Sequence, residues 1–262
     1  MLINNILMNF FQVFFIIFIF SLLITGIFLG IRSIQISQKN LLYITIAFIL
    51  VSIGFIGNII FGLGLIFEEI LVTVGFILFA LFTYSTFHQD YKQKFILVLA
   101  LIVIFGLIHF IFQVLFIYEN TPSIHLISKL LDVGFTFLTF GYFGYSSYSA
   151  YLRIKEFDLK PWIKVRYKLL AYSAFLLSFQ AVPEILLVPY GIEYGQTGEI
   201  SAILAFGITA VLVLIFSICN VVAWFMPKAL KKILSSKTSS SPEKDLKEEE
   251  IMDIIKNEIN SN

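Results

Sequence analysis

Seven long apolar stretches alternate with short polar ones along this chain, and this pattern determines the expected fold. A helix needs about 20 residues to cross a hydrocarbon layer about 30 Å thick, and each stretch is close to that length. None of them alternates apolar and polar residues as a barrel strand does, so helices are expected. The expected spans are Asn9–Ile31, Leu41–Leu63, Ile70–Phe87, Phe95–Tyr118, Ile124–Tyr151, Lys168–Tyr190 and Glu199–Met226.

The composition places these spans in lipid. Of the 262 residues, 59% are apolar and only 13% are charged, and the mean hydropathy is +0.93. A soluble domain carries about a quarter charged residues. Residues 1–7 hold no Lys or Arg, and the first apolar run is too long for a signal peptide, so we expect a retained span. The predicted fold class is an all-α, seven-transmembrane helix bundle, multi-pass in the cell membrane.

Charge in the loops predicts the orientation. The stretch Tyr151–Lys168 holds six bases against two acids, and bases near span ends favour the cytoplasmic side. The six bases are Arg153, Lys155, Lys160, Lys164, Arg166 and Lys168. Loops on the other side contain Glu68, Glu69, Glu119, Glu193 and Glu199. The N-terminus is therefore expected outside and the C-terminus inside, with the six bases available to a cytoplasmic protein partner.

The chain divides into residues 1–234, the membrane domain, and residues 235–262, a cytoplasmic tail. The tail opens with the Ser/Thr-rich linker SSKTSSSP. Beyond it, Ile251, Ile254, Ile255 and Ile259 share one helical face, which predicts either a short docking helix or a loosely ordered solubilising tail. The tail is too short for a catalytic domain, so a signal would have to leave through a separate protein.

Polar residues inside the spans are the candidate ligand-binding residues, because ionisable groups in a bilayer need a reason to be there. Three successive spans each carry a polar pair on one helical face, at a similar depth toward the outer side. The residues are His109 and Gln113, Lys129 and Asp132, Gln180 and Glu184, with Asn58 at comparable depth in the second span.

Two interpretations of these pairs stay open. They either converge on a water-accessible, outward-opening pocket, or they are hydrogen-bonding contacts between helices without a ligand. Lys129 is expected to neutralise either Asp132 or Glu184. Pro183, beside Glu184, is expected to free a backbone carbonyl one turn earlier. His88 and His125 are expected to be solvated, and the alternating small and aromatic residues of the fifth span to serve packing or an aromatic cleft.

Motifs for other chemistry are missing from the sequence. The single cysteine, Cys219, excludes an intrachain disulfide, and no C-x-x-C, H-E-x-x-H, G-x-S-x-G or phosphate-loop pattern occurs. No basic surface suited to nucleic acid is apparent. We therefore expect no enzyme activity, no cofactor, no metal and no nucleic-acid partner.

Seven spans with an outer N-terminus resemble rhodopsins, G-protein-coupled receptors and the sensor modules of prokaryotic kinases. The resemblance is one of topology. The seventh span has no lysine for a retinal Schiff base, FHQDYK lacks the D-R-Y arginine, and NVVAW replaces N-P-x-x-Y. Glu68 and Glu69, followed by Phe105 and His109, partly resemble the E-E-x-x-x-R and F-x-x-x-H motifs of CAAX-type intramembrane proteases. Thr73, however, stands where that family has arginine.

The leading hypothesis is a receptor-like sensor that binds a small ligand in the outer polar pocket and signals to cytoplasmic partners. The alternative is a secondary transporter or proton-coupled carrier that uses His109, Asp132 and Glu184 as protonatable groups. A third reading is a scaffold whose basic loop binds anionic lipid.

Overall fold

The structure is a computed structural model, and it describes residues 2–88, 92–119, 121–157, 159–192 and 198–236. These residues contain helices and no β-strand, which confirms the all-α class. The helices are α1 (Leu2–Gln35), α2 (Asn40–Ile59), α3 (Leu65–Phe87), α4 (Lys92–Glu119), α5 (Pro122–Ile154), α6 (Pro161–Leu177), α7 (Val182–Leu187), α8 (Ile200–Phe225) and α9 (Lys228–Ser236).

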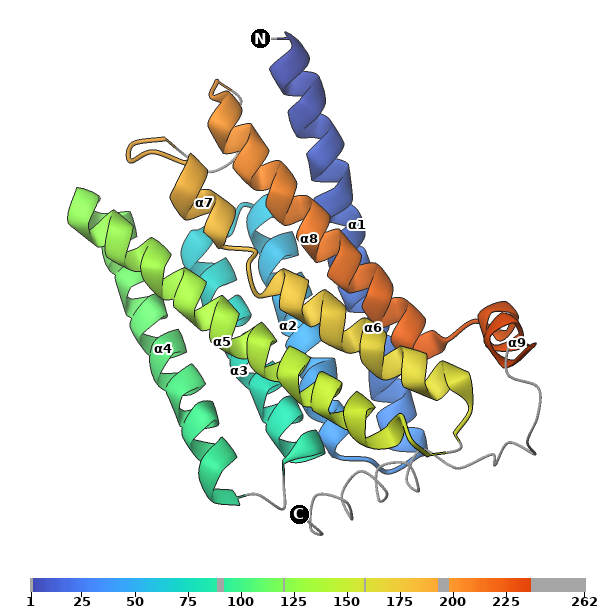
Figure 1. The fold of residues 1–262 in the computed structure, drawn as a ribbon. Helices are drawn as coiled ribbons and strands as arrows, with labels where there is room; N and C mark the ends of the chain where they lie inside the picture. Colours follow the sequence, from blue (N-terminus) through green and yellow to red (C-terminus); the bar gives the residue numbers. More distant parts are fainter. Residues whose placement is uncertain (1, 89–91, 120, 158, 193–197, 237–262) are drawn as a thin grey trace.

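Seven spans form a closed ring in chain order. Each span packs against the next, with α6 and α7 together making the sixth, and α8 returns to contact α1; α3 also contacts α5 across the ring (Figure 1). The spans alternate in direction, so every second connecting loop lies at the same end of the bundle. Loops rich in acidic residues therefore lie at one end and loops rich in basic residues at the other. We call the end that holds Glu68, Glu69 and Glu199 the acidic end, and the end that holds Arg32, Arg153 and α9 the basic end.

Aromatic side chains fill the centre of the bundle. The Phe79 ring lies 4.7 Å from that of Phe143 and 5.5 Å from that of Phe140, and Phe140 lies 5.6 Å from Phe216 of α8. All four side chains are buried. Outward-facing Ile, Leu and Phe side chains are instead exposed along every long helix, as expected where lipid is the solvent. The aromatic residues Phe140 and Phe143 of the fifth span therefore serve packing.

The expected basic loop Tyr151–Lys168 is mostly helical. The α5 helix continues to Ile154 and α6 begins at Pro161, so the connection is residues 155–160, and Lys164, Arg166 and Lys168 lie in α6. Proline at the first helical position explains the early start, because its fixed φ suits a helix and its missing N–H has no partner there anyway. Bases are tolerated because these turns lie near the end of the span.

A short amphipathic helix that the sequence analysis did not predict follows the last span. Helix α9 combines Leu230, Ile233 and Leu234 with three lysines, and it takes in Ser235 and Ser236, which were expected to begin the linker. In Figure 1 it lies beside the basic end of α8, crosswise to the bundle. The predicted docking face of Ile251, Ile254, Ile255 and Ile259 lies outside the described residues.

A close helix approach occurs where α3 crosses α2 at Gly75. A Cβ added at this position would lie 2.6 Å from Val51 Cγ2 and 3.1 Å from the carbonyl oxygen of Ala47. Contact with backbone cannot be relieved by rotating a side chain. In contrast, Gly141 of α5 has nothing within 4 Å of the same position.

These two glycines make a matched pair for testing the packing. We expect Gly75→Ala to lower the melting temperature of the purified protein, since overpacking costs about 1–3 kcal/mol. Gly141→Ala should leave it unchanged or raise it, because alanine favours a helix over glycine by about 1 kcal/mol. Equal melting temperatures for the two variants in detergent would contradict the close α2–α3 approach.

Candidate functional site

An ion pair at the acidic end joins α5 to the short helix α7. Lys129 Nζ lies 2.6 Å from Glu184 Oε1, and the two side chains are only 13% and 14% exposed. Lys129 is in the second turn of α5, which begins at Pro122 after the Thr121 cap; the Thr121 hydroxyl accepts from the Ile124 amide. Of the two partners predicted for Lys129, the structure places Glu184 of the neighbouring sixth span beside it.

A second contact joins α4 to α5 beside this pair. His109 Nε2 lies 3.7 Å from Asp132 Oδ1, and the imidazole stacks on Phe135 with ring centroids 5.8 Å apart. One turn further along α4, the buried Gln113 side chain accepts a 2.5 Å hydrogen bond from the Ser128 hydroxyl of α5. We call His109, Lys129, Asp132 and Glu184 the charged cluster; the structure brings these four predicted residues together.

Glu69 is a neighbour of this cluster that the sequence analysis assigned to a loop. Helix α3 begins at Leu65, so Glu69 lies inside the helix and is half-buried. Its carboxylate is close enough to Asp132, Lys129 and Glu184 to interact with their charges. The apolar run alone placed the start of this span at Ile70, and this boundary error hid the residue.

Asn58 and Gln180 make hydrogen bonds between helices and are not among the contacts of the charged cluster. The Asn58 amide donates a 2.6 Å hydrogen bond to Glu68 Oε2, which joins α2 to the first turn of α3. Gln180 makes its contact through the backbone, where its carbonyl oxygen accepts a 2.8 Å hydrogen bond from the Thr209 hydroxyl of α8. Both contacts match the helix-to-helix hydrogen bonding that the sequence left open.

The sixth span is broken next to Pro183 and Glu184. Helix α6 ends at Leu177, residues 178–181 form turns, and α7 begins at Val182. Proline has no N–H to continue the helical ladder, and its ring clashes with the carbonyl four residues earlier. The break leaves the Gln180 carbonyl available, and Thr209 satisfies it. A backbone break at membrane depth is tolerated where neighbouring helices supply such partners.

Two ring nitrogens near the cluster lack a hydrogen bond within the described part of the chain. They are Nδ1 of His109 and Nδ1 of His125, both buried. His125, which was expected to be solvated, is half-buried, and its ring packs 5.0 Å from that of Phe116 and 5.6 Å from that of Tyr190. Other buried side-chain atoms along the bundle, such as the Thr139 and Ser147 hydroxyls, also lack a partner among the described residues.

His88, also expected to be solvated, is buried at the basic end with 3% of its surface exposed. Its Nε2 lies 2.8 Å from the Ser146 hydroxyl of α5, and its ring stacks on Phe95 with centroids 3.6 Å apart. Tyr142 flanks it at 5.4 Å. Burial, and to a smaller extent the Arg153 charge, lowers the pKa of His88 to about 4. The error arose because Tyr142 and Ser146 of α5 are distant in sequence, and because only the packing of α4 against α3 brings Phe95 against the His88 ring.

This histidine should make stability depend on pH. Because its pKa is lowered in the folded protein, the unfolded chain binds a proton between about pH 6.5 and 4 that the folded chain does not. Stability is full above that window and should fall by up to about 3 kcal/mol as pH drops through it. Thermal unfolding measured from about pH 8 to about pH 3 checks this, because that range brackets both pKa values.

His88→Gln should flatten that pH dependence relative to the unmodified protein. Ser146→Ala is the control, since it removes the hydrogen bond but leaves the buried imidazole, and its pH dependence should persist. A slope that is unchanged in His88→Gln would assign the acid sensitivity to other groups.

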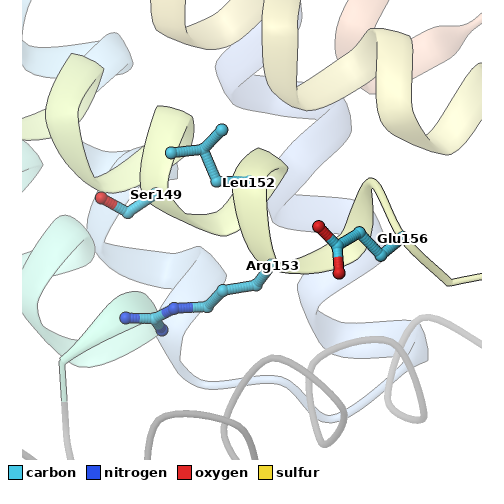
Figure 2. A pocket seen from close by; sticks show the side chains of 4 residues that line it. All are labelled: Ser149, Leu152, Arg153 and Glu156. Carbon is cyan, nitrogen blue, oxygen red and sulfur yellow. The ribbon is translucent and has the colours of Figure 1, made fainter. Parts of the chain in front are cut away.

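The six predicted cytoplasmic bases are spread over the basic end. Arg166 lies 4.5 Å above the Trp224 ring and Lys168 4.7 Å from the Tyr151 ring centroid. Lys164 donates to the Lys155 carbonyl at 2.8 Å. An open hollow of about 360 Å³ lies at the end of α5 and the start of the connection that follows it. Figure 2 shows the side chains that line it, which are Ser149, Leu152, Arg153 and Glu156.

Within the described residues, no three His, Cys, Asp or Glu side chains are placed to hold a metal ion. The seven helices are long and apolar enough to cross a membrane, and charged residues lie in their interior. The fold and site thus define a multi-pass, seven-helix membrane protein. Comparison with protein-family models, with curated proteins and with solved structures gives no match.

The Lys129–Glu184 pair should behave as a buried ion pair. Lys129→Met leaves Glu184 as a buried charge without its counter-ion, which typically costs about 3–5 kcal/mol. The double variant Lys129→Met/Glu184→Gln removes both charges and should recover most of that loss. Thermal stability of the two single variants and the double variant, read as a double-mutant cycle, measures the coupling. Additive effects would show that the pair is not energetically coupled.

Proposed function

We propose that this protein is a receptor-like sensor of the cell membrane, which binds a small polar ligand at the charged cluster. The observation that carries the proposal is the Lys129–Glu184 ion pair, which spans from the continuous helix α5 to the far side of the break in the sixth span. Charges inside spans usually mark a functional site. The ligand class it fits carries a carboxylate, an amine or both, since these groups can replace either partner of the pair.

Several polar groups at and near the charged cluster could bind such a ligand. The Asp132 side chain remains 29% exposed while it contacts His109, and the buried Nδ1 atoms of His109 and His125 can each accept or donate one hydrogen bond. A ligand bound here would satisfy atoms that the described residues leave without a hydrogen bond. This supports a binding site over helix-to-helix contacts alone.

A single helix connects the charged cluster to the basic end of the bundle. Helix α5 runs 33 residues from Pro122, near Lys129, to Ile154 at the basic end, where the short connection to α6 begins. A ligand that competes for Lys129 or Glu184 changes the force between α5 and α7, and the turns at 178–181 can absorb a shift of α7. We infer that such a shift alters the basic surface read by a cytoplasmic protein partner.

A proton-coupled carrier is the second candidate, and the broken sixth span favours it. Many transporters bind substrate and ions where a helix is interrupted near mid-membrane. His109, Asp132 and Glu184 supply protonatable groups beside the interruption. The same residues could serve either a sensor or a carrier, so a measurement of transport is needed to distinguish the two functions.

Ligand screening by thermal shift tests the site. A panel of small amino acids, organic acids and amines is expected to contain compounds that stabilise the protein; at about 100 times Kd the gain is about 2.7 kcal/mol. That gain should be lost in Glu184→Gln and kept in Glu199→Gln, which removes an exposed acid at the same end. Competitive binding that survives loss of both Asp132 and Glu184 would refute the assigned site.

Flux in proteoliposomes separates the two functions. For a sensor, compounds that bind should not be transported, and the interior pH should stay constant. Solute or proton flux that Glu184→Gln abolishes and Glu199→Gln preserves would establish the carrier and exclude the sensor.

A further inference from the structure

A hollow at the basic end differs in character from the charged cluster. It encloses about 240 Å³ between the ends of α1 and α8, the first turns of α6, and α9. Its lining includes three bases from three different helices, Arg32, Arg166 and Lys231, together with both tryptophans of the chain, Trp162 and Trp224. Among the described residues that line the hollow, none is acidic.

The tryptophans hold these bases in place. The Arg166 guanidinium lies 4.5 Å from the Trp224 ring centroid, and Lys231 Nζ lies 4.4 Å from that of Trp162. Arg32 Nη1 donates a 3.4 Å hydrogen bond to the Trp224 carbonyl. Contact with an aromatic face attracts a cation and helps to fix its position. Three positive charges are thus gathered around one hollow, which is a favourable environment for an anion with several oxygens.

The location points to the headgroup layer of the membrane. Four helices begin or end around the hollow, so it lies where the spans leave the hydrocarbon. Tryptophan concentrates at this depth, and bases next to span ends attract anionic lipids. Helix α9, with lysines on one side and Leu230, Ile233 and Leu234 on the other, has the pattern of a helix that lies in the interface plane.

An apolar track leads from the hollow along the bundle. Phe225 lines the hollow, and its ring packs 5.4 Å from that of Phe28 of α1, whose side chain is half exposed. Ile24 and Ile218 continue the exposed surface toward mid-span on the same two helices. A soluble anion would make no favourable contact with this apolar surface, whereas the acyl chain of a lipid could pack along it.

We propose that the hollow binds the phosphate headgroup of an anionic phospholipid from the adjoining leaflet, with an acyl chain along Phe225 and Phe28. Arg32, Arg166 and Lys231 contact the phosphate oxygens, and Trp162 and Trp224 flank the headgroup. The site is independent of the ligand site at the acidic end. A lipid bound here joins α1, α6, α8 and α9, and so couples lipid composition to the connection between α5 and α6.

Tryptophan fluorescence reports on this site directly, because the chain has two tryptophans and both line the hollow. The full-length protein is placed in phosphatidylcholine nanodiscs, which expose both leaflets and need no known orientation. Increasing fractions of phosphatidylglycerol with brominated acyl chains are then added, and quenching is compared with that by brominated phosphatidylcholine. We expect half-maximal quenching at an about fivefold lower mole fraction of the anionic lipid.

Two triple variants separate the site from general surface charge. Arg32→Gln/Arg166→Gln/Lys231→Gln should reduce that preference to less than about twofold. Lys39→Gln/Lys155→Gln/Lys232→Gln removes three exposed lysines at the same end and should retain it. Lys231→Gln alone should lower the preference partway. Because Lys231 lies on the short helix outside the seven spans, this variant tests the site even if the triple variant does not fold.

Three results would overturn the proposal. One is equal quenching by the two lipids in the unmodified protein, and another is an equal loss of preference in both triple variants. The third is that inorganic phosphate abolishes the preference while sodium chloride of the same ionic strength does not, which would identify a soluble anion as the ligand.

Discussion

The absence of water from a bilayer core is the constraint on which this structure depends. Each backbone amide and carbonyl there must be bonded within the protein, and a helix is the simplest way to satisfy all of them locally. Long apolar runs thus become long helices, and lipid covers the side chains that a soluble protein would bury. Association between the helices then relies on packing and on interhelical hydrogen bonds, such as those of Ser52 to the Ile19 carbonyl and Asn40 to the Ser85 carbonyl.

The sixth span departs from this rule, and its departure organises the acidic end. Pro183 interrupts the ladder, and Thr209 of α8 satisfies the Gln180 carbonyl that the interruption leaves available. Glu184 follows directly and is neutralised by Lys129. The break and the ion pair therefore compensate one another: the pair fixes a helix too short to be stable alone, and the break lets Glu184 meet α5.

The two ends of the bundle carry opposite chemistry for different reasons. At the acidic end, charges lie inside the bundle and neutralise one another. At the basic end, cations lie on tryptophan and tyrosine rings near the ends of the spans. Helix α5 connects the two chemistries without interruption.

Hydropathy by itself determined the seven spans and the all-α class, because burial in lipid is a property of each segment alone. Helical spacing, which is also local, placed the candidate pairs at His109, Lys129, Asp132 and Glu184, and Pro183 indicated a freed carbonyl within the sixth span but not the break at residues 178–181. Only the tertiary structure decided that Lys129 pairs with Glu184, that Glu69 joins the cluster, and that His88 is buried against Phe95 and Ser146. These outcomes depend on which faces of separate helices meet, and the spacing of residues along one helix contains no information about its neighbour's rotation.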